Sequence, residues 1–296
     1  MLDVRRLRLL RELNHRGTIA AVAHALSYTP SAVSQQLSAL ERETGRALLA
    51  RSGRRVTLTP QGLRLAEHAE AVLAELERAQ ASLVDQRELS GTVRLGAFTT
   101  ALTRLAIPAI AGLARIYPDL SIEVTEMDPA AGPDMLRGNL LDLALIHEYD
   151  NVPSTLGAGI EADPLLDEVV FFASTTRPLV EPGDIIRAHA SSRWIVGNAG
   201  TLCHTMAVRS CQASGFEPTV AHRIDDFDAV LRLVAAGGGV ALVPQLGVNE
   251  VPDGVMLTPL AIRRQTRVAY RRGSGEQPAL AAVCDQLRWA AGRATN

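Results

Sequence analysis

The chain has no lysine and only three cysteines. All 30 of its basic residues are arginine, which we attribute to GC-rich codon usage, with bidentate phosphate binding as a secondary benefit. The cysteines, Cys203, Cys211 and Cys284, are too few for a secreted disulfide framework and indicate a reducing compartment. The first residues lack the apolar core of a signal peptide, and no apolar run is long enough to span a bilayer. We therefore expect a cytoplasmic protein with no membrane partner.

Positive charge is concentrated at the amino-terminal end. Residues 1–60 contain ten arginines and four acidic residues, a balance of +6, so the rest of the chain carries −8 within the net charge of −2. A basic head on an acidic body predicts a polyanionic partner at one end. The length of 296 residues and the hydrophobic content of 47% suffice for about two domains with separate cores.

Three helices and a hairpin are expected in the first sixty residues. Apolar residues recur at helical spacing from Val4 to Leu13, and Gly17 ends this first helix. A second, alanine-rich helix begins behind the capping residue Thr18. Thr29-Pro30 opens a third helix, because a capping hydroxyl and a first-turn proline both favour a helix start.

The third predicted helix has one apolar and one polar face. Short hydrogen-bonding side chains are expected on the outer face, namely Ser31, Ser34, Gln35 and Ser38. Such side chains reach base edges in a helix-turn-helix, and glutamine pairs bidentately with adenine. Residues 48–58 then predict a short hairpin, or wing, whose cations suit the DNA backbone or minor groove: Arg51, Arg54 and Arg55. A solvated helix on an ordinary helical domain is the plainer alternative.

Residues 18–61 resemble the DNA-binding domain of LysR-type transcriptional regulators. The resemblance rests on the alanine-rich second helix, the segment PSAVSQQL, the LExxxG turn at Leu40–Gly45, Arg51 and the run LTPQG at 58–62. The remaining chain fits the family's plan in length and order. Two departures affect base preference and wing packing: Pro30 stands where many relatives have glutamine, and Ala50 replaces the usual phenylalanine before Arg51.

The resemblance implies a role for each of these positions. It assigns base contacts to Ser31, Ser34 and Gln35, and phosphate or minor-groove contacts to the three wing arginines; Ser38 and Arg42 would either lie near the DNA backbone or be solvated. The predicted DNA-binding set is Thr29, Pro30, Ser31, Ser34, Gln35, Ser38, Arg51, Arg54 and Arg55. The implied partner is double-stranded DNA with an imperfect inverted repeat, bound by a dimer that joins a second dimer in a tetramer.

A long amphipathic helix is expected from Thr59-Pro60 to about Glu88, and self-pairing through residues 60–88 would cover its apolar stripe. After residue 90 strands and helices alternate, which predicts a mostly parallel α/β sheet. The expected fold class is α/β: a winged helix-turn-helix (1–60), a long linker and dimerisation helix (61–90), and a two-lobed effector domain (91–296) similar to periplasmic binding proteins. Lobe 1 is expected over 91–162 and 267–296, and lobe 2 over 163–266.

Two predicted helix starts are candidates for effector binding, because helix amino termini favour anions. They carry Thr99, Thr100 and Thr103 in one lobe, and Gly200 and Thr201 in the other. Plain helix caps are the alternative. The family resemblance supports a small-molecule effector between the lobes, with an anion as one option, and adds three pocket candidates: Asp128, His147 and Phe227. A structural role is the alternative for the histidine.

Rival functions find less support in the sequence. Some LysR-type regulators sense peroxide through a disulfide, and Cys203 with Cys211 could form one in the second lobe; the same pair with His204 is poorly spaced for zinc. No catalytic motif such as G-x-S-x-G or H-E-x-x-H is present, so neither an enzyme nor a catalytic, metal or cofactor site is expected. A solute-binding protein is disfavoured by the basic head.

Overall fold

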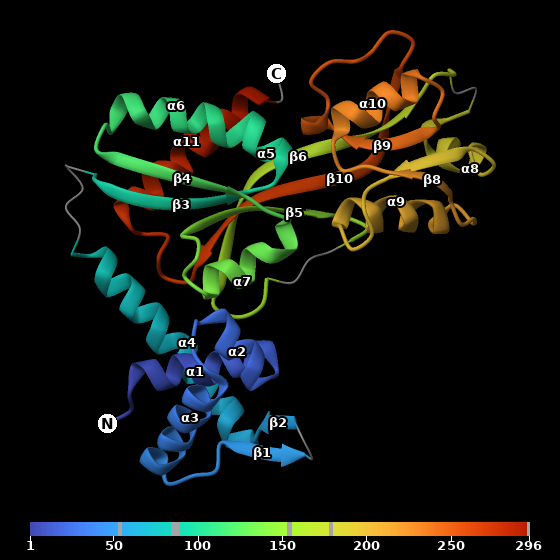
Figure 1. The fold of residues 1–296 in the computed structure, drawn as a ribbon. Coiled ribbons are helices and arrows are strands. Elements are labelled where there is room, and N and C mark those ends of the chain that lie inside the picture. The colour runs from blue at the N-terminus through green and yellow to red at the C-terminus, as the bar shows by residue number, and fades with distance from the viewer. Residues whose placement is uncertain (53–54, 84–88, 153–155, 178–179, 295–296) are drawn as a thin grey trace.

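The computed structural model describes residues 1–52, 55–83, 89–152, 156–177 and 180–294. A small helical head lies at one end, the long helix α4 leads away from it, and an α/β effector domain forms the rest (Figure 1). Within the described residues, no helix is long and apolar enough to cross a membrane.

The head consists of three helices and a hairpin: α1 (Val4–Arg16), α2 (Ile19–Ala25), α3 (Pro30–Thr44), β1 (Leu49–Ser52) and β2 (Arg55–Leu58). The Oγ1 atom of Thr18 accepts a hydrogen bond from the Ala21 N–H, and Thr29 caps α3 in the same way. Gly17 and Gly45 adopt the left-handed conformation that ends α1 and α3. The caps and the wing hairpin therefore lie where the sequence predicts them.

Helix α4 (Pro60–Ala81) starts against the wing. A Cβ atom on Gly62 would lie 2.2 Å from the Leu48 carbonyl oxygen, so this close approach requires glycine. Ala66 and Ala69 are buried in the head core. The helix ends at Ala81, earlier than predicted, because the chain turns at the C-cap; residues 84–88 lie outside the described residues.

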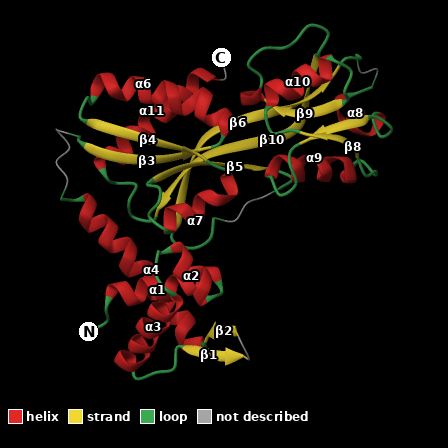
Figure 2. Cartoon of the chain, viewed as in Figure 1, coloured by secondary structure: helices red, strands yellow, loops and turns green. Residues whose placement is uncertain are grey.

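One eight-stranded sheet runs through the whole effector domain, in the order β4-β3-β5-β10-β6-β9-β7-β8 (Figure 2). Its strands are β3 (Gly91–Ala97), β4 (Leu120–Glu126), β5 (Leu143–Tyr149), β6 (Ile160–Ser174), β7 (Arg193–Val196), β8 (Thr219–Arg223), β9 (Val240–Pro244) and β10 (Met256–Arg271). The helical elements are α5 (Thr99–Ala101), a π turn (Leu102–Ala106), α6 (Ile107–Ile116), α7 (Gly132–Arg137), α8 (Ile185–Ala188), α9 (Leu202–Ala213), α10 (Phe227–Ala235), α11 (Pro278–Ala294) and short 3-10 turns at Pro129–Ala131, Pro182–Asp184 and Gln245–Gly247.

The centre of the sheet differs from the mostly parallel arrangement that the sequence predicts. Strands β6 and β10 are long, pair antiparallel, and pass from one lobe to the other; β5 and β9 are also antiparallel to them. Parallel pairing occurs only further out, where β3 joins β4 and β5, and β7 joins β8 and β9. The predicted lobe boundaries at 162/163 and 266/267 consequently fall inside β6 and β10.

Each lobe has its own cores on the two sides of this sheet. In lobe 1, α6 and α11 cover one face, where Leu105 and Leu287 are buried, and α7 covers the other. In lobe 2, α8 and α9 pack on one face around Trp194, and α10 packs on the other. The helical segment after β3 is divided into α5 and α6 by the π turn, which precedes Pro108; proline cannot donate a helical hydrogen bond there.

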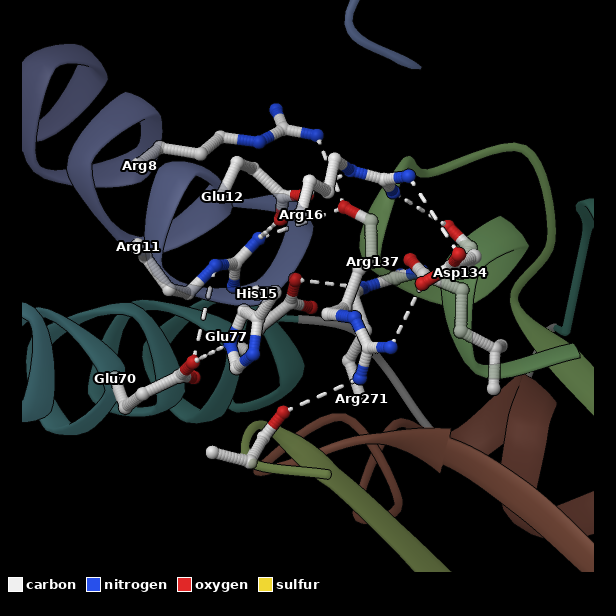
Figure 3. Close-up of polar contacts among 12 residues, drawn as sticks. Arg8, Arg11, Glu12, His15, Arg16, Glu70, Glu77, Asp134, Arg137 and Arg271 are labelled. Carbon is white, nitrogen blue, oxygen red and sulfur yellow. Dashed lines mark hydrogen bonds and ion pairs between the residues drawn. The ribbon is translucent and has the colours of Figure 1, made fainter. Parts of the chain in front are cut away.

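One ion pair and hydrogen bonds from arginines of α1 hold the head against its own effector domain (Figure 3). On α1, the fully buried Glu12 accepts from Arg11 at 2.6 Å and from Arg16 at 2.7 Å. Burial alone would raise the pKa of Glu12, but the two arginines outweigh it and lower the pKa. Arg16 also reaches Asp134 of α7 at 3.6 Å, and the guanidinium of Arg11 approaches the Arg137 carbonyl oxygen.

A second set of contacts joins the effector domain to α4. Arg271 at the end of β10 pairs with Glu77 at 2.9 Å and donates to the Leu141 carbonyl at 2.7 Å. Next to it, a Cβ atom on Gly273 would lie 2.3 Å from the Ala74 carbonyl oxygen. The linker helix therefore lies tightly against the carboxyl end of β10 (Figure 3).

Candidate DNA interface and effector cleft

The buried side of α3 fixes which residues face outward. Val33, Leu37 and Leu40 are buried in the head core. Ser31 and Gln35 are exposed and Ser34 is half-buried. These three positions are spaced i, i+3 and i+4, so they share one helix face. They form the polar surface that the sequence predicts for base contacts.

The other predicted DNA-binding residues surround this surface. Thr29 and Pro30 are exposed at the start of α3, and Ser38 is half-buried two turns along it from Ser31. Of Arg51 and Arg55 the structure describes only the backbone, within β1 and β2; Arg54 lies outside the described residues. Their contacts with DNA remain predictions.

Two residues that the sequence reading missed hold α3 in place. The Oε1 atom of Glu41 accepts from the backbone N–H groups of Leu48 and Leu49, at 2.9 and 3.0 Å, and so ties α3 to the wing. Arg6 of α1 donates to the Gln36 side chain at 2.9 Å. No local sequence signal marks such contacts, because each joins elements that are separate along the chain.

Six of the eight predicted effector residues line one cleft of about 340 Å³ between the lobes: Thr99, Thr100, Asp128, His147, Thr201 and Phe227. Thr103 lines an adjacent hollow of about 150 Å³, and its hydroxyl donates to the Thr99 carbonyl. Gly200 lines neither cavity; its φ of +96° is the conformation that leads into α9. Polar atoms at strand ends thus converge as the rule for open α/β sheets predicts.

His147 lies on β5 at the floor of the cleft and is only 5% exposed. Its ring packs edge-on against Phe98 and Tyr149, with centroid separations of 4.6 and 5.3 Å. Neither ring nitrogen has a hydrogen-bond partner among the described residues. Burial, and then the nearby Arg264, lower the pKa of His147 well below its usual value, so the ring is neutral.

Arg264 of β10 is the main cleft residue that the sequence reading missed. Its Nε atom donates to Glu168 at 2.6 Å, and its Nη2 atom donates to the Thr100 hydroxyl at 3.2 Å. The guanidinium also lies 5.2 Å from the centre of the Phe98 ring. The second oxygen of Glu168 accepts from the Leu246 N–H at 2.6 Å. This fully buried ion pair joins β6 to β10 beneath the cleft.

Further cleft residues were not predicted as effector contacts, although most adjoin residues that were: Phe98, Glu126, Met127, Pro129, Leu202, Cys203 and Asp225. Glu126 and Asp225 follow the same rule as the predicted residues, since each lies where a strand ends. That rule could have found them. Among the described residues, no group of histidine, cysteine and acidic side chains is arranged to hold a metal ion.

The two cysteines of the redox alternative lie on one helix. Cys203 and Cys211 are eight residues apart in α9, which separates them by about 12 Å along the helix axis. A disulfide needs Cα atoms within about 7 Å, so α9 would have to unwind. Burial raises the pKa of both thiols, that of Cys211 to about 12. The geometry of the reduced chain therefore does not favour this alternative.

Family comparisons identify both parts of the chain. Residues 4–63 match the bacterial regulatory helix-turn-helix proteins of the lysR family, and residues 86–291 match the LysR substrate binding domain. The chain belongs to the LysR family of transcription regulators. As a LysR-type regulator it binds DNA through its helix-turn-helix head, responds to a small-molecule effector through its effector domain, and forms oligomers.

Individual relatives agree with this assignment. The chain is 31% identical to a probable hydrogen peroxide-inducible genes activator of Mycobacterium avium over 82% of this chain and 78% of that protein. It is 28% identical to the nitrogen assimilation regulatory protein nac of Escherichia coli over 86% of this chain and 82% of that protein. Among solved structures, a cysteine mutant of OxyR from Corynebacterium glutamicum gives a TM-score of 0.60 at 22% identity, covering 99% and 93%. The structure of full-length BenM gives a TM-score of 0.58 at 22% sequence identity, and the match covers 99% of this chain and 97% of that one. These structures show that the LysR-family fold extends over the whole chain.

Proposed function

We propose that this LysR-family regulator reads an imperfect inverted repeat through Ser31, Ser34 and Gln35 of α3. The observation that carries the proposal is the polar face of α3, which a buried apolar stripe directs outward. The wing arginines, with Thr29, Pro30 and Ser38 nearby, contact the phosphates or the minor groove on either side. The basic balance of the head supplies the long-range attraction to DNA.

The protein pairs through α4. Two large apolar side chains that lie four residues apart on one face of this helix, Val72 and Leu76, are at least 40% exposed. A second copy of α4 would cover them, since an unpartnered apolar stripe is unfavourable in water. Pairing two heads places two α3 helices in successive major grooves. Two such dimers then assemble into a tetramer through their effector domains.

The effector binds in the cleft between the lobes. There it meets neutral His147, the Arg264 guanidinium and the amino-terminal end of α9, where the first N–H groups of the helix lack partners within it. An anionic group on the effector would face Arg264 and this helix end. Binding that prefers the closed cleft shifts the population of lobe arrangements, and the Arg16–Asp134 ion pair between head and lobe 1 carries that shift to the DNA-binding surface.

Location and activity follow from the same proposal. The protein acts in the cytoplasm, where bacterial DNA is found, and it regulates without catalysing a reaction. The absence of catalysis is tested by incubating the protein with any compound found to bind in the cleft; no product should form.

Gel-shift titrations at fixed salt test the DNA proposal. The protein should prefer its own upstream region over a scrambled duplex, and Gln35→Ala should reduce that preference about tenfold, as expected for one lost bidentate base contact. Gln36→Ala is the matched control: it is the adjacent glutamine on the same helix, but its side chain is held by Arg6. Equal binding of wild type to both duplexes, with and without candidate effectors, would contradict the proposal.

A further inference from the structure

Negative charge at the rim of the cleft indicates a class of ligand. Glu126 and Asp128 follow β4 in lobe 1, and Asp225 follows β8 in lobe 2; all three line the cleft. None of them forms an ion pair with another described residue. The cation that lines the cleft, Arg264, is neutralised by Glu168 at 2.6 Å. Three carboxylate charges are therefore left without a counter-charge.

Neutral hydrogen bonds position these carboxylates. Glu126 accepts from the Thr99 hydroxyl at 2.5 Å, and Asp128 accepts from the Ala130 N–H at 2.8 Å. Asp225 accepts from the backbone N–H and the side-chain amide of Asn198, at 2.8 and 2.5 Å. Such neutral donors orient a carboxylate without cancelling its charge. Like charges on the two lobes then repel each other, and this repulsion opposes closure of the cleft.

His147 is an independent indication of a ligand. It is 5% exposed, lines the cleft, and has no partner for either ring nitrogen among the described residues. A neutral imidazole offers one donor and one acceptor. Buried polar groups without a partner are rare and unfavourable, so an unpaired one at a cleft floor marks a place for a ligand atom.

We propose that the effector carries a protonated amine, which lies between Asp128 and Asp225, and a hydroxyl or amide group, which hydrogen-bonds to His147. This inference rests on the proposed function, in which the cleft holds the effector. With the anionic group proposed above, the effector is a zwitterion. Its amine replaces repulsion between the lobes by attraction to both, so it binds the closed cleft more tightly than the open one.

Thermal unfolding of the full-length protein tests the inference against a panel of L-α-amino acids, primary amines and short-chain carboxylates. The stabilising compounds should carry an amine. Asp128→Asn, Asp225→Asn and Glu126→Gln should each weaken their binding about tenfold, which is the loss of one charge-assisted hydrogen bond. Asp253→Asn removes the same charge from an exposed loop position outside the cleft and should change nothing. Binding should also weaken as salt is raised.

The outcomes separate the two proposals. Stabilisation by carboxylates alone, or amine binding that the three cleft variants leave unchanged, would overturn the inference while the cleft remained the effector site. A panel in which no compound stabilises the protein would contradict the cleft proposal itself. The midpoints of the ligand-free variants show whether each one is folded before binding is compared.

Discussion

The head and the effector cleft differ in charge and in construction. The proposed DNA surface of the head comes from one helix and the adjacent hairpin, within a region whose balance is +6. The cleft draws on strand ends from both lobes and is rimmed by carboxylates above a buried arginine. A uniform polyanion such as DNA can be met by a short, exposed segment. A small ligand requires polar groups that converge from distant parts of the chain.

The buried pair beneath the cleft should give the largest effect. Arg264→Met leaves the buried Glu168 without its cation, which should lower the free energy of unfolding by about 3–5 kcal/mol in denaturant titrations. Arg263→Met is the matched control, because that neighbouring arginine pairs with Asp167 at an exposed position; its loss should be about 1 kcal/mol or less. Similar losses for both variants would show that burial does not distinguish the pairs.

A close backbone contact in the head should give the next largest effect. Gly62→Ala places a methyl group against the Leu48 carbonyl and should destabilise the head by about 1–3 kcal/mol. Amide hydrogen exchange should show lost protection in α1 to α4 and unchanged protection in the effector domain. Gly292→Ala, whose new methyl group would meet nothing within 4 Å on α11, should leave stability unchanged or raise it. If the head of Gly62→Ala kept its protection from amide exchange, the close approach of Gly62 to the Leu48 carbonyl would not matter for stability.

The buried His147 of the cleft should make the stability of the protein depend on pH. The folded-state pKa of His147 is lowered, so below about pH 6.5 the unfolded chain takes up a proton that the folded chain does not. This stability is present above that pH and is lost as the pH falls. His147→Phe should therefore reduce the slope of unfolding free energy against pH, between pH 6.5 and 5, by up to about 1.4 kcal/mol per unit.

The cysteines should give the smallest effect. Replacing Cys203 and Cys211 together by serine should leave the response of DNA binding to peroxide as it is in the wild type, because both thiols are held protonated within one helix. Gel shifts with and without peroxide measure this, with Cys284→Ser as control. A peroxide response that only the double variant loses would establish redox sensing.

The sequence predicts the head better than the cleft, for a physical reason. The caps at Thr18 and Thr29 and the stop at Gly45 act within a few residues, so their signals are local. Convergence of strand ends is a general rule and correctly brings Thr100, Thr201 and four other predicted residues to one cleft. It misplaces Thr103 and Gly200, whose short-range helix signals carry no information about the direction of the cleft.

The least predictable part is the centre of the sheet. Charged residues such as Glu168 and Arg264 interrupt the apolar pattern of β6 and β10, so the pattern does not reveal the full length of either strand. The two charges are tolerated because each neutralises the other across the antiparallel pair. That compensation depends on a contact between residues 96 positions apart, and no local pattern reveals it.

Strand β10 has one further consequence. It carries Arg264 beneath the cleft and, seven residues later, Arg271 against Glu77 of the linker helix. Seven residues of strand span about 23 Å, and hydrogen-bonded neighbours support this stretch on both sides. Pairing on both sides resists bending of the strand, apart from one register shift against β6 between Thr266 and Arg267. A ligand that displaces Arg264 along the strand would thus push directly on α4, and the distance from effector to DNA-binding head would be crossed without a hinge.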